Sequence, residues 1–272
     1  MSKKGSSFKD ALQNVFAVSV ILIGFVISYA LFKTVMGNPV NFEGGNPAGR
    51  ALEGNYLGII YKGGPIVPIL MTCVLTLIVF IFERLITLSR AKGKGRLNAF
   101  VHNLQTLLSE DKIEEAMVVC DKQKGSLANV MKAGLLRYRD LQKDKELEKD
   151  QKILSIQKSF EEATALELPM LSKNMVIFST LASISVLIGL IGTVLGMIRA
   201  FAALAQSGTP DALQLSQGIS EALVNTAFGI TGSTLSIIAF NFFTSNIDSY
   251  TYKIDEAGFS LTQNFAASLK EQ

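Results

Sequence analysis

Polar side chains interrupt two long apolar stretches in the last third of the chain. Six of them lie where the neighbouring positions are nearly all apolar or small: Thr193, Asn225, Thr226, Thr231, Ser233 and Thr234. A hydroxyl group both donates and accepts hydrogen bonds, so a group of hydroxyls on two adjacent helices could line a water-filled path. A serine or threonine can also bond to its own helix backbone, and that alternative stays open for each residue.

Charged residues are absent from the middle of both stretches. Arg199 lies six residues after Thr193, and Glu221 lies five residues before Thr226. A helix rises 1.5 Å per residue, so each charge would lie about 8 Å from its threonine, at the same end of the two segments. The two charges form either a salt bridge near the membrane boundary or two ordinary interfacial side chains. A hydroxyl path here holds no buried carboxylate to bind a proton, so another chain would have to supply one.

Small residues recur along the same two stretches. Those of the first repeat every seven residues, at Ala182, Gly189, Gly196 and Ala203. Those of the second share one broad face, at Ala222, Thr226, Gly229, Ser233 and Ser236. Small side chains let membrane helices approach closely, so tight helix packing is one interpretation of the glycines and alanines.

The elements that would position these residues are membrane-spanning helices. Hydrophobic residues make up 49 % of the 272 residues and charged residues only 18 %, against about a quarter in an average soluble protein. Four charge-free stretches, 11–32, 63–82, 174–198 and 222–247, each reach about 20 residues or more, the length that crosses a bilayer as a helix. Two cysteines exclude a disulfide scaffold, and a net charge of +3 gives no indication of nucleic-acid binding. The predicted fold is an all-α polytopic membrane protein with four transmembrane helices.

The first stretch has a second interpretation as a signal peptide, because lysines precede it and Ser28, Tyr29 and Ala30 resemble a cleavage site. Its apolar run is longer than a signal-peptide core, which favours a retained helix. Lysine and arginine crowd before the first stretch and after the second, which places both termini and the middle region in the cytoplasm. Apolar residues at helical spacing predict a helical domain for that middle region.

The predicted organisation therefore has six parts. An N-terminal transmembrane helix with a short cytoplasmic start (1–37) is followed by an irregular periplasmic loop (38–64) and a second transmembrane helix (65–83). A cytoplasmic helical domain (84–172) precedes the third and fourth transmembrane helices (173–247). A separate cytoplasmic helix (248–272) ends the chain.

Two motifs resemble the MotA/TolQ/ExbB proton-channel family, and its ExbB and TolQ branch in particular. The run LIGLIGTVLGMIRAF at 187–201 is similar to the family's leucine–glycine–threonine run, and GISEALVNTAFG at 218–229 is similar to the start of its last span. Asn241 and the pair Glu83 and Arg84 also match. The chain departs from the family at Val186 and Leu235, where prolines are common, so helix bends could differ.

The resemblance implies a homopentameric ring in a bacterial inner membrane, with the third and fourth helices around a central pore. It implies an ExbD- or TolR-like single-span partner that carries a membrane aspartate, and a TonB-like protein energised by the proton motive force. The proton-pathway residues would be Thr193, Thr226 and Glu221. The implied pore lining is Asn225, Gly229, Ser233, Gly189 and Gly196.

Other functions stay open. Within the family, a TolQ-like role in envelope maintenance or a motility motor fits the same residues. A passive membrane scaffold would tolerate loss of the hydroxyl groups, and a solute transporter would need broken helices or inverted repeats, which the sequence does not show. His102 is the only histidine, and neither it nor Cys73 and Cys120 has the spacing of a metal or nucleophile site, so we expect no cofactor, no metal and no enzyme activity.

Overall fold

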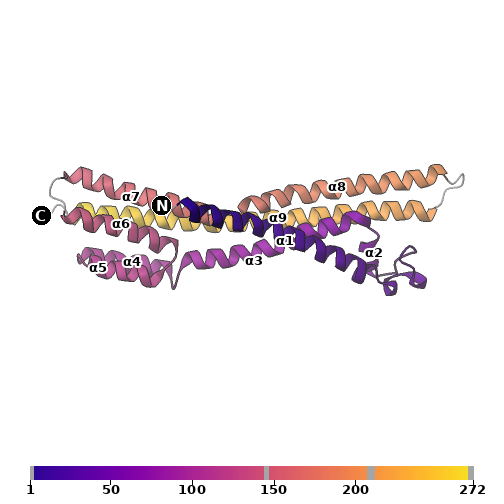
Figure 1. Cartoon of the computed structure of the whole chain (residues 1–272), viewed down its shortest axis with the longest axis horizontal. Helices are drawn as coiled ribbons and strands as arrows, with labels where there is room; N and C mark the ends of the chain where they lie inside the picture. Colours follow the sequence, from indigo (N-terminus) through magenta and orange to yellow (C-terminus); the bar gives the residue numbers. More distant parts are fainter. Residues whose placement is uncertain (1–2, 144–146, 207–211, 269–272) are drawn as a thin grey trace. The chain divides into compact units, whose positions relative to one another are not determined.

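The computed structural model describes residues 3–143, 147–206 and 212–268, and these form α-helices and short turns (Figure 1). The described residues contain no β-strand and one isolated antiparallel bridge between Phe42 and Ala51. The predicted all-α class is confirmed. The chain divides into two compact units, a first unit of Met1–Phe82 with Val176–Phe240 and a second unit of Glu83–Met175 with Asn241–Gln272.

The first unit is made of long apolar helices. It contains α1 (Lys3–Leu31), the start of α3 (Val67–Lys92), nearly all of α8 (Met175–Gln206) and the first half of α9 (Ala212–Ser268). Four helical segments are long and apolar enough to cross a membrane, as predicted. Large side chains such as Leu187, Val194 and Phe201 on α8 are exposed, which a water-soluble surface rarely tolerates over so large an area. The chain is a multi-pass membrane protein.

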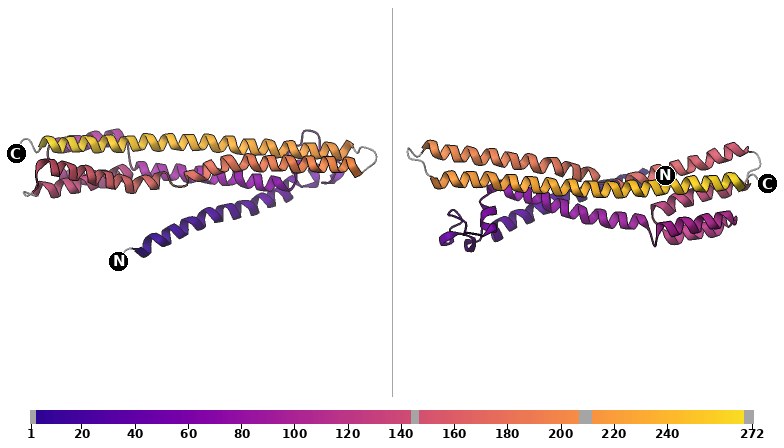
Figure 2. Two further views of the ribbon diagram at one scale, coloured as in Figure 1. Left: turned by 90° about the horizontal axis from the view of Figure 1, so that it is seen from above. Right: turned by 180° about the vertical axis from the view of Figure 1, so that it is seen from behind.

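Two helix pairs organise the first unit. Helix α8 runs side by side with the first half of α9 in all views (Figures 1 and 2). Helix α1 contacts α3 through an edge-to-face pair of Phe16 and Phe80, with ring centroids 6.1 Å apart. Gly24 of α1 lies against Thr72 and Thr76 of α3, so the small residue lets the two helices approach.

The segment between α1 and α3 is more ordered than the predicted irregular loop. It contains a π-helical turn (Phe32–Met36), three 3-10 turns (Pro39–Asn41, Glu43–Gly45 and Gly64–Ile66) and the short helix α2 (Tyr56–Tyr61). The Asn55 side chain caps α2 by accepting hydrogen bonds from the amides of Leu57 and Gly58, at 3.0 and 3.1 Å. Helix α2 was not predicted, because it has only six residues and no long apolar period.

The second unit is helical and includes the segment from 84 to 172 for which we expected a helical domain. Helices α4 (Leu97–Ser109), α5 (Ile113–Gln123), α6 (Ser126–Lys143) and α7 (Lys149–Leu171) pack with the last part of α9. The Phe160 ring lies against Gly134, where any Cβ atom would come within 2.1 Å of the ring. The Tyr250 hydroxyl donates to the Ala91 carbonyl at 2.5 Å and accepts from the Leu127 amide at 3.2 Å, so it joins α9 to two other helices.

The C-terminal region differs from the prediction. We expected residues 248–272 to form a helix of their own, but α9 is one continuous helix from Ala212 to Ser268. The sequence has no proline in this range, and exposed acidic residues such as Asp248 and Glu256 do not end a helix. The polar residues at the start of the tail therefore indicate that the surroundings of the helix change there, while the helix itself continues.

Candidate functional site

Thr193 of α8 and Thr226 of α9 lie level with each other and form a direct hydrogen bond between their hydroxyl groups. The Thr193 hydroxyl also approaches the carbonyls of Gly189 at 3.1 Å and Ala222 at 3.3 Å, and that of Thr226 lies 3.2 Å from the Ala222 carbonyl. Both side chains are half-buried. Each hydroxyl therefore has backbone acceptors for its own proton and retains acceptor capacity of its own.

Arg199 and Glu221 form an ion pair on the same side of the threonine pair. The Arg199 side chain is 49 % exposed, whereas the Glu221 side chain is only 10 % exposed. We predicted that both residues lie at the ends of their charge-free spans, and the helices that contain them extend further. Helix α8 continues seven residues past Arg199 to Gln206, and α9 begins nine residues before Glu221, so the pair lies about two helical turns inside both elements.

Three glycines that we expected among the pore-lining residues lie in the contact between α8 and α9. A Cβ atom at Gly189, Gly196 or Gly229 would come within 3.0, 2.8 and 2.7 Å of a backbone oxygen of the facing helix. No larger residue fits there without separating the helices. The structure does not bring these glycines to an open face of the chain, and the packing interpretation accounts for them.

Two further candidates for the pore lining are also enclosed. Asn225 is fully buried, and its side-chain amide donates to the Gly63 carbonyl at 2.9 Å. Its Oδ1 atom has no hydrogen-bond partner among the described residues. Ser233 is 8 % exposed. Because assembly can only bury more surface, the half-buried threonines are better placed than Asn225 or Ser233 to face a shared path.

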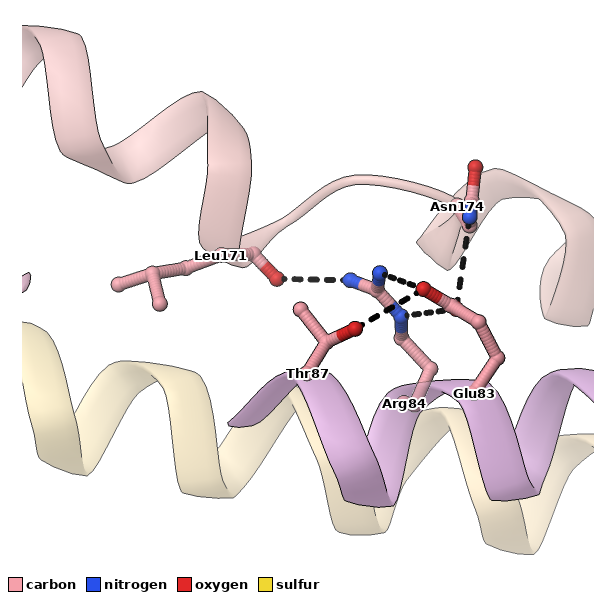
Figure 3. A network of polar contacts seen from close by, with 5 residues as sticks. All are labelled: Glu83, Arg84, Thr87, Leu171 and Asn174. Atoms are coloured by element: carbon pink, nitrogen blue, oxygen red, sulfur yellow. Dashed lines mark hydrogen bonds and ion pairs between the residues drawn. The ribbon is translucent and has the colours of Figure 1, made fainter. Parts of the chain in front are cut away.

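The Glu83 and Arg84 pair has a structural role that the sequence did not reveal (Figure 3). The guanidinium of Arg84 binds both carboxylate oxygens of Glu83, at 2.7 and 2.6 Å, and donates to the Leu171 carbonyl at the end of α7, at 3.2 Å. Glu83 also accepts from Thr87 at 3.0 Å and from Asn174 at 3.4 Å. Arg84 is 1 % exposed, so this network ties α3 to the end of α7 inside the second unit.

Metal and nucleophile chemistry has little basis in the described residues. They contain no group of three or more histidine, cysteine or acidic residues that could hold a metal ion. His102 is exposed on α4, and Cys120 is 1 % exposed in the core of the second unit. Burial raises the pKa of the Cys120 thiol to about 12, whereas a reactive cysteine has a lowered pKa.

Cys120 should therefore resist alkylation. In a Cys73→Ala variant at pH 8, about one Cys120 thiol in ten thousand would be the reactive thiolate. We expect N-ethylmaleimide to label the folded protein at least about a hundredfold more slowly than the denatured protein, and the rate to rise about tenfold per pH unit. Mass spectrometry over time measures both rates, and equal rates would contradict the buried position.

These features define a class, an all-α multi-pass membrane protein with a paired hydroxyl site between two of its long helices. A sequence profile of the MotA/TolQ/ExbB proton channel family matches residues 122–256. The matched range includes α9 down to Glu256 and all of α8, and so both threonines. The chain belongs to the MotA/TolQ/ExbB proton channel family, which confirms the resemblance of the two motifs.

Individual relatives carry the names of the ExbB and TolQ branch. The chain is 37 % identical over 89 residues to an ExbB-like biopolymer transport protein of Synechocystis sp., which covers 32 % of this chain and 42 % of that protein. It is 36 % identical over 72 residues to the biopolymer transport protein ExbB of Salmonella typhimurium, covering 26 % and 30 %. It is 36 % identical over 75 residues to the Tol-Pal system protein TolQ of Haemophilus influenzae, covering 28 % and 33 %. Each match spans less than half of the relative.

Proposed function

We propose that the chain is the proton-channel subunit of an inner-membrane motor that uses the proton motive force to energise TonB-dependent transport across the outer membrane. One observation carries this proposal. Two hydroxyl groups from adjacent spanning helices meet at a half-buried position, in a pair of helices that holds no ionisable residue at that depth. A hydroxyl pair orients water and hydrogen-bonds a proton carrier, but it does not bind the proton itself.

The missing proton-binding group comes from a partner in this proposal. An ExbD- or TolR-like protein with a single span brings a membrane aspartate into the centre of a homopentamer. A carboxylate is costly to keep charged in a medium of low dielectric constant, so a proton arriving from the periplasm neutralises it. Thr193 and Thr226 accept the hydrogen bond of the neutral acid or order the water that delivers the proton. Release to the cytoplasm restores the charge and drives movement of the partner.

The proposal includes the location and mode of action of the protein. The protein lies in a bacterial inner membrane with α1 retained and both termini in the cytoplasm. It acts through proton flow and movement and not as an enzyme, and it needs no cofactor. Glu221 belongs to the proton pathway on the periplasmic side, paired with Arg199.

A second candidate within the family is a TolQ-like role in envelope maintenance. It is supported by a relative named TolQ at 36 % identity, the same identity as the Salmonella typhimurium ExbB. A motility motor rests on the same residues. A non-conducting scaffold is the alternative of another class, and it predicts that loss of the threonine hydroxyls has no effect.

Reconstitution with and without a partner tests the proposal. The full chain is purified alone and with a co-expressed single-span protein that carries a membrane aspartate, and both are placed in liposomes with a pH-sensitive dye and an imposed voltage. We expect proton flux only with the partner, and loss of flux when the partner's aspartate is replaced by asparagine. Strong flux through the chain alone, or none with any such partner, would overturn the assignment.

A further inference from the structure

The turn that leads into α3 contacts one helical turn of α9, the turn from Glu221 to Asn225. The buried Asn225 amide donates to the Gly63 carbonyl at 2.9 Å. A Cβ atom on Gly63 would lie 2.8 Å from Cγ1 of Val224. A Cβ atom on Gly64 would lie 2.4 Å from Oε1 of Glu221, and 3.5 Å from Nη1 of Arg199. The backbone of this turn therefore lies directly against the ion pair.

Gly64 occupies a conformation that few other residues adopt. Its φ of +75° lies in the left-handed region, where a Cβ atom is strained. Two separate requirements, the backbone angle and the space beside the carboxylate, therefore select glycine at this position. The space requirement concerns Glu221 alone, because the atoms nearest to a Cβ on Gly64 are those of that carboxylate.

The turn is held in place by the ordered segment before it. The Tyr61 ring stacks on Phe32 at 4.6 Å between ring centroids and meets the edge of Phe42 at 5.5 Å. The Lys62 ammonium donates to the carbonyls of Pro47 and Ala48, both at 2.9 Å. Aromatic pairs and charge-assisted hydrogen bonds of this kind fix a backbone more firmly than a solvated loop. The position of Gly64 is thus set by contacts of the end of α2 with the segment that precedes this helix.

We propose that Gly64 is a positioning residue for Glu221, and that the loop before the second span holds this carboxylate against Arg199. The backbone of Gly64 occupies the space beside the carboxylate, so the Glu221 side chain stays with the one cation it contacts. Movement of the periplasmic segment would then displace the carboxylate. The consequence for proton flux rests on the proposed function, whereas the contact between Gly64 and Glu221 does not.

A matched pair of alanine substitutions tests the contact. Gly54 has the same φ of +75° in the same segment, and a Cβ atom there would meet nothing within 4 Å. Gly54→Ala and Gly64→Ala therefore carry the same kind of backbone strain, and only Gly64→Ala collides with Glu221. In the purified full chain we expect Gly64→Ala to lower the Tm more than Gly54→Ala does. In a Glu221→Ala background, which removes the colliding carboxylate, the two should have equal effects.

The extent of chemical modification of Glu221 is a measurement that general destabilisation of the protein would not change. Dicyclohexylcarbodiimide reacts with carboxyl groups in membrane proteins, and peptide mass spectrometry identifies the modified residue. We expect Gly64→Ala to raise modification of Glu221 at least about threefold, because a carboxylate displaced from Arg199 is no longer covered by its ion-pair partner. Gly54→Ala should leave modification unchanged, and Glu221→Ala should remove that product.

The outcomes separate this inference from the proposed function. If Gly64→Ala and Gly54→Ala behave alike in both measurements, the positioning role is wrong, whatever the flux results show. If the two differ as expected while the chain conducts no protons with any partner, the contact stands and the channel assignment fails. Where both hold, Gly64→Ala should reduce partner-dependent flux at least about fivefold relative to Gly54→Ala.

Discussion

Replacing Thr193 or Thr226 by valine should reduce partner-dependent proton flux by about tenfold to a hundredfold. Valine keeps the shape of threonine and removes only the hydroxyl group. A hydrogen bond to a charged group contributes about 1.5–3 kcal/mol, and each 1.4 kcal/mol corresponds to about a tenfold change in rate. The two hydroxyls bond to each other, so either substitution also leaves the remaining hydroxyl without its partner. Flux in liposomes that contain the reconstituted complex measures the effect.

Thr231→Val is the matched control for this prediction. Thr231 lies five residues further along α9 and is exposed, and its hydroxyl donates to the Ala227 carbonyl of its own helix at 2.8 Å. The same chemical change at this position should leave flux within about twofold of the parent protein, because a back-bonded hydroxyl contributes little. All three variants should insert into the membrane normally. Full flux in both Thr193→Val and Thr226→Val would remove the hydroxyl pair from the pathway and favour the scaffold alternative.

The sequence predicts the long elements well, because their signals are local. A charge-free run of twenty residues is a physical requirement for crossing a bilayer, and it is visible without any knowledge of tertiary contacts. The helices α1, α3, α8 and α9 all contain such a run. The seven-residue spacing of Gly189 and Gly196 indicates which face of α8 meets α9. The position of Thr193 beside Thr226 could therefore also be predicted from the sequence.

Contacts between distant segments were not predictable in the same way. Asn225 was placed among pore-lining residues because it is polar in an apolar stretch, yet its partner is the Gly63 carbonyl, 162 residues away. A polar residue in a span is an equally good signal for a wet surface and for a buried hydrogen bond to a distant backbone group. The two glycines before Pro65 lie at the end of the segment predicted as an irregular loop, and nothing local relates them to Glu221.

Helix ends were misplaced for a related reason. The limits of α8 and α9 were set at the first charges, Arg199 and Glu221, because a charge ends an apolar window. A charge ends an apolar window but does not end a helix, so both helices continue past these two residues, which pair with each other. Pairing across two elements is a tertiary property, and a scan of one segment at a time treats each charge as solitary.

Replacing Arg84 by methionine should destabilise the protein by roughly 3–5 kcal/mol, the usual cost of breaking a buried ion pair by removing one partner. Arg84 is 1 % exposed, and its loss leaves the Glu83 carboxylate and the Leu171 carbonyl without their shared donor (Figure 3). For a chain of this size we expect the Tm to fall by about 10 °C. Arg90→Met is the control, because Arg90 lies in the exposed last turn of α3 and should shift the Tm by less than about 2 °C.

A double substitution separates the ion pair from the carbonyl contact. In Glu83→Gln with Arg84→Met no charge is left unpaired, so part of the lost stability should return, as it does when both members of a buried pair are replaced. Recovery should be incomplete, because the Leu171 carbonyl at the end of α7 still lacks the donor at 3.2 Å. Thermal unfolding followed by size-exclusion chromatography measures the parent protein and all three variants. If the Arg84→Met protein is as stable as Arg90→Met, the ion pair stabilises neither the junction of α3 with α7 nor the fold of the second unit. Full recovery of stability in the double variant would assign the whole effect to charge.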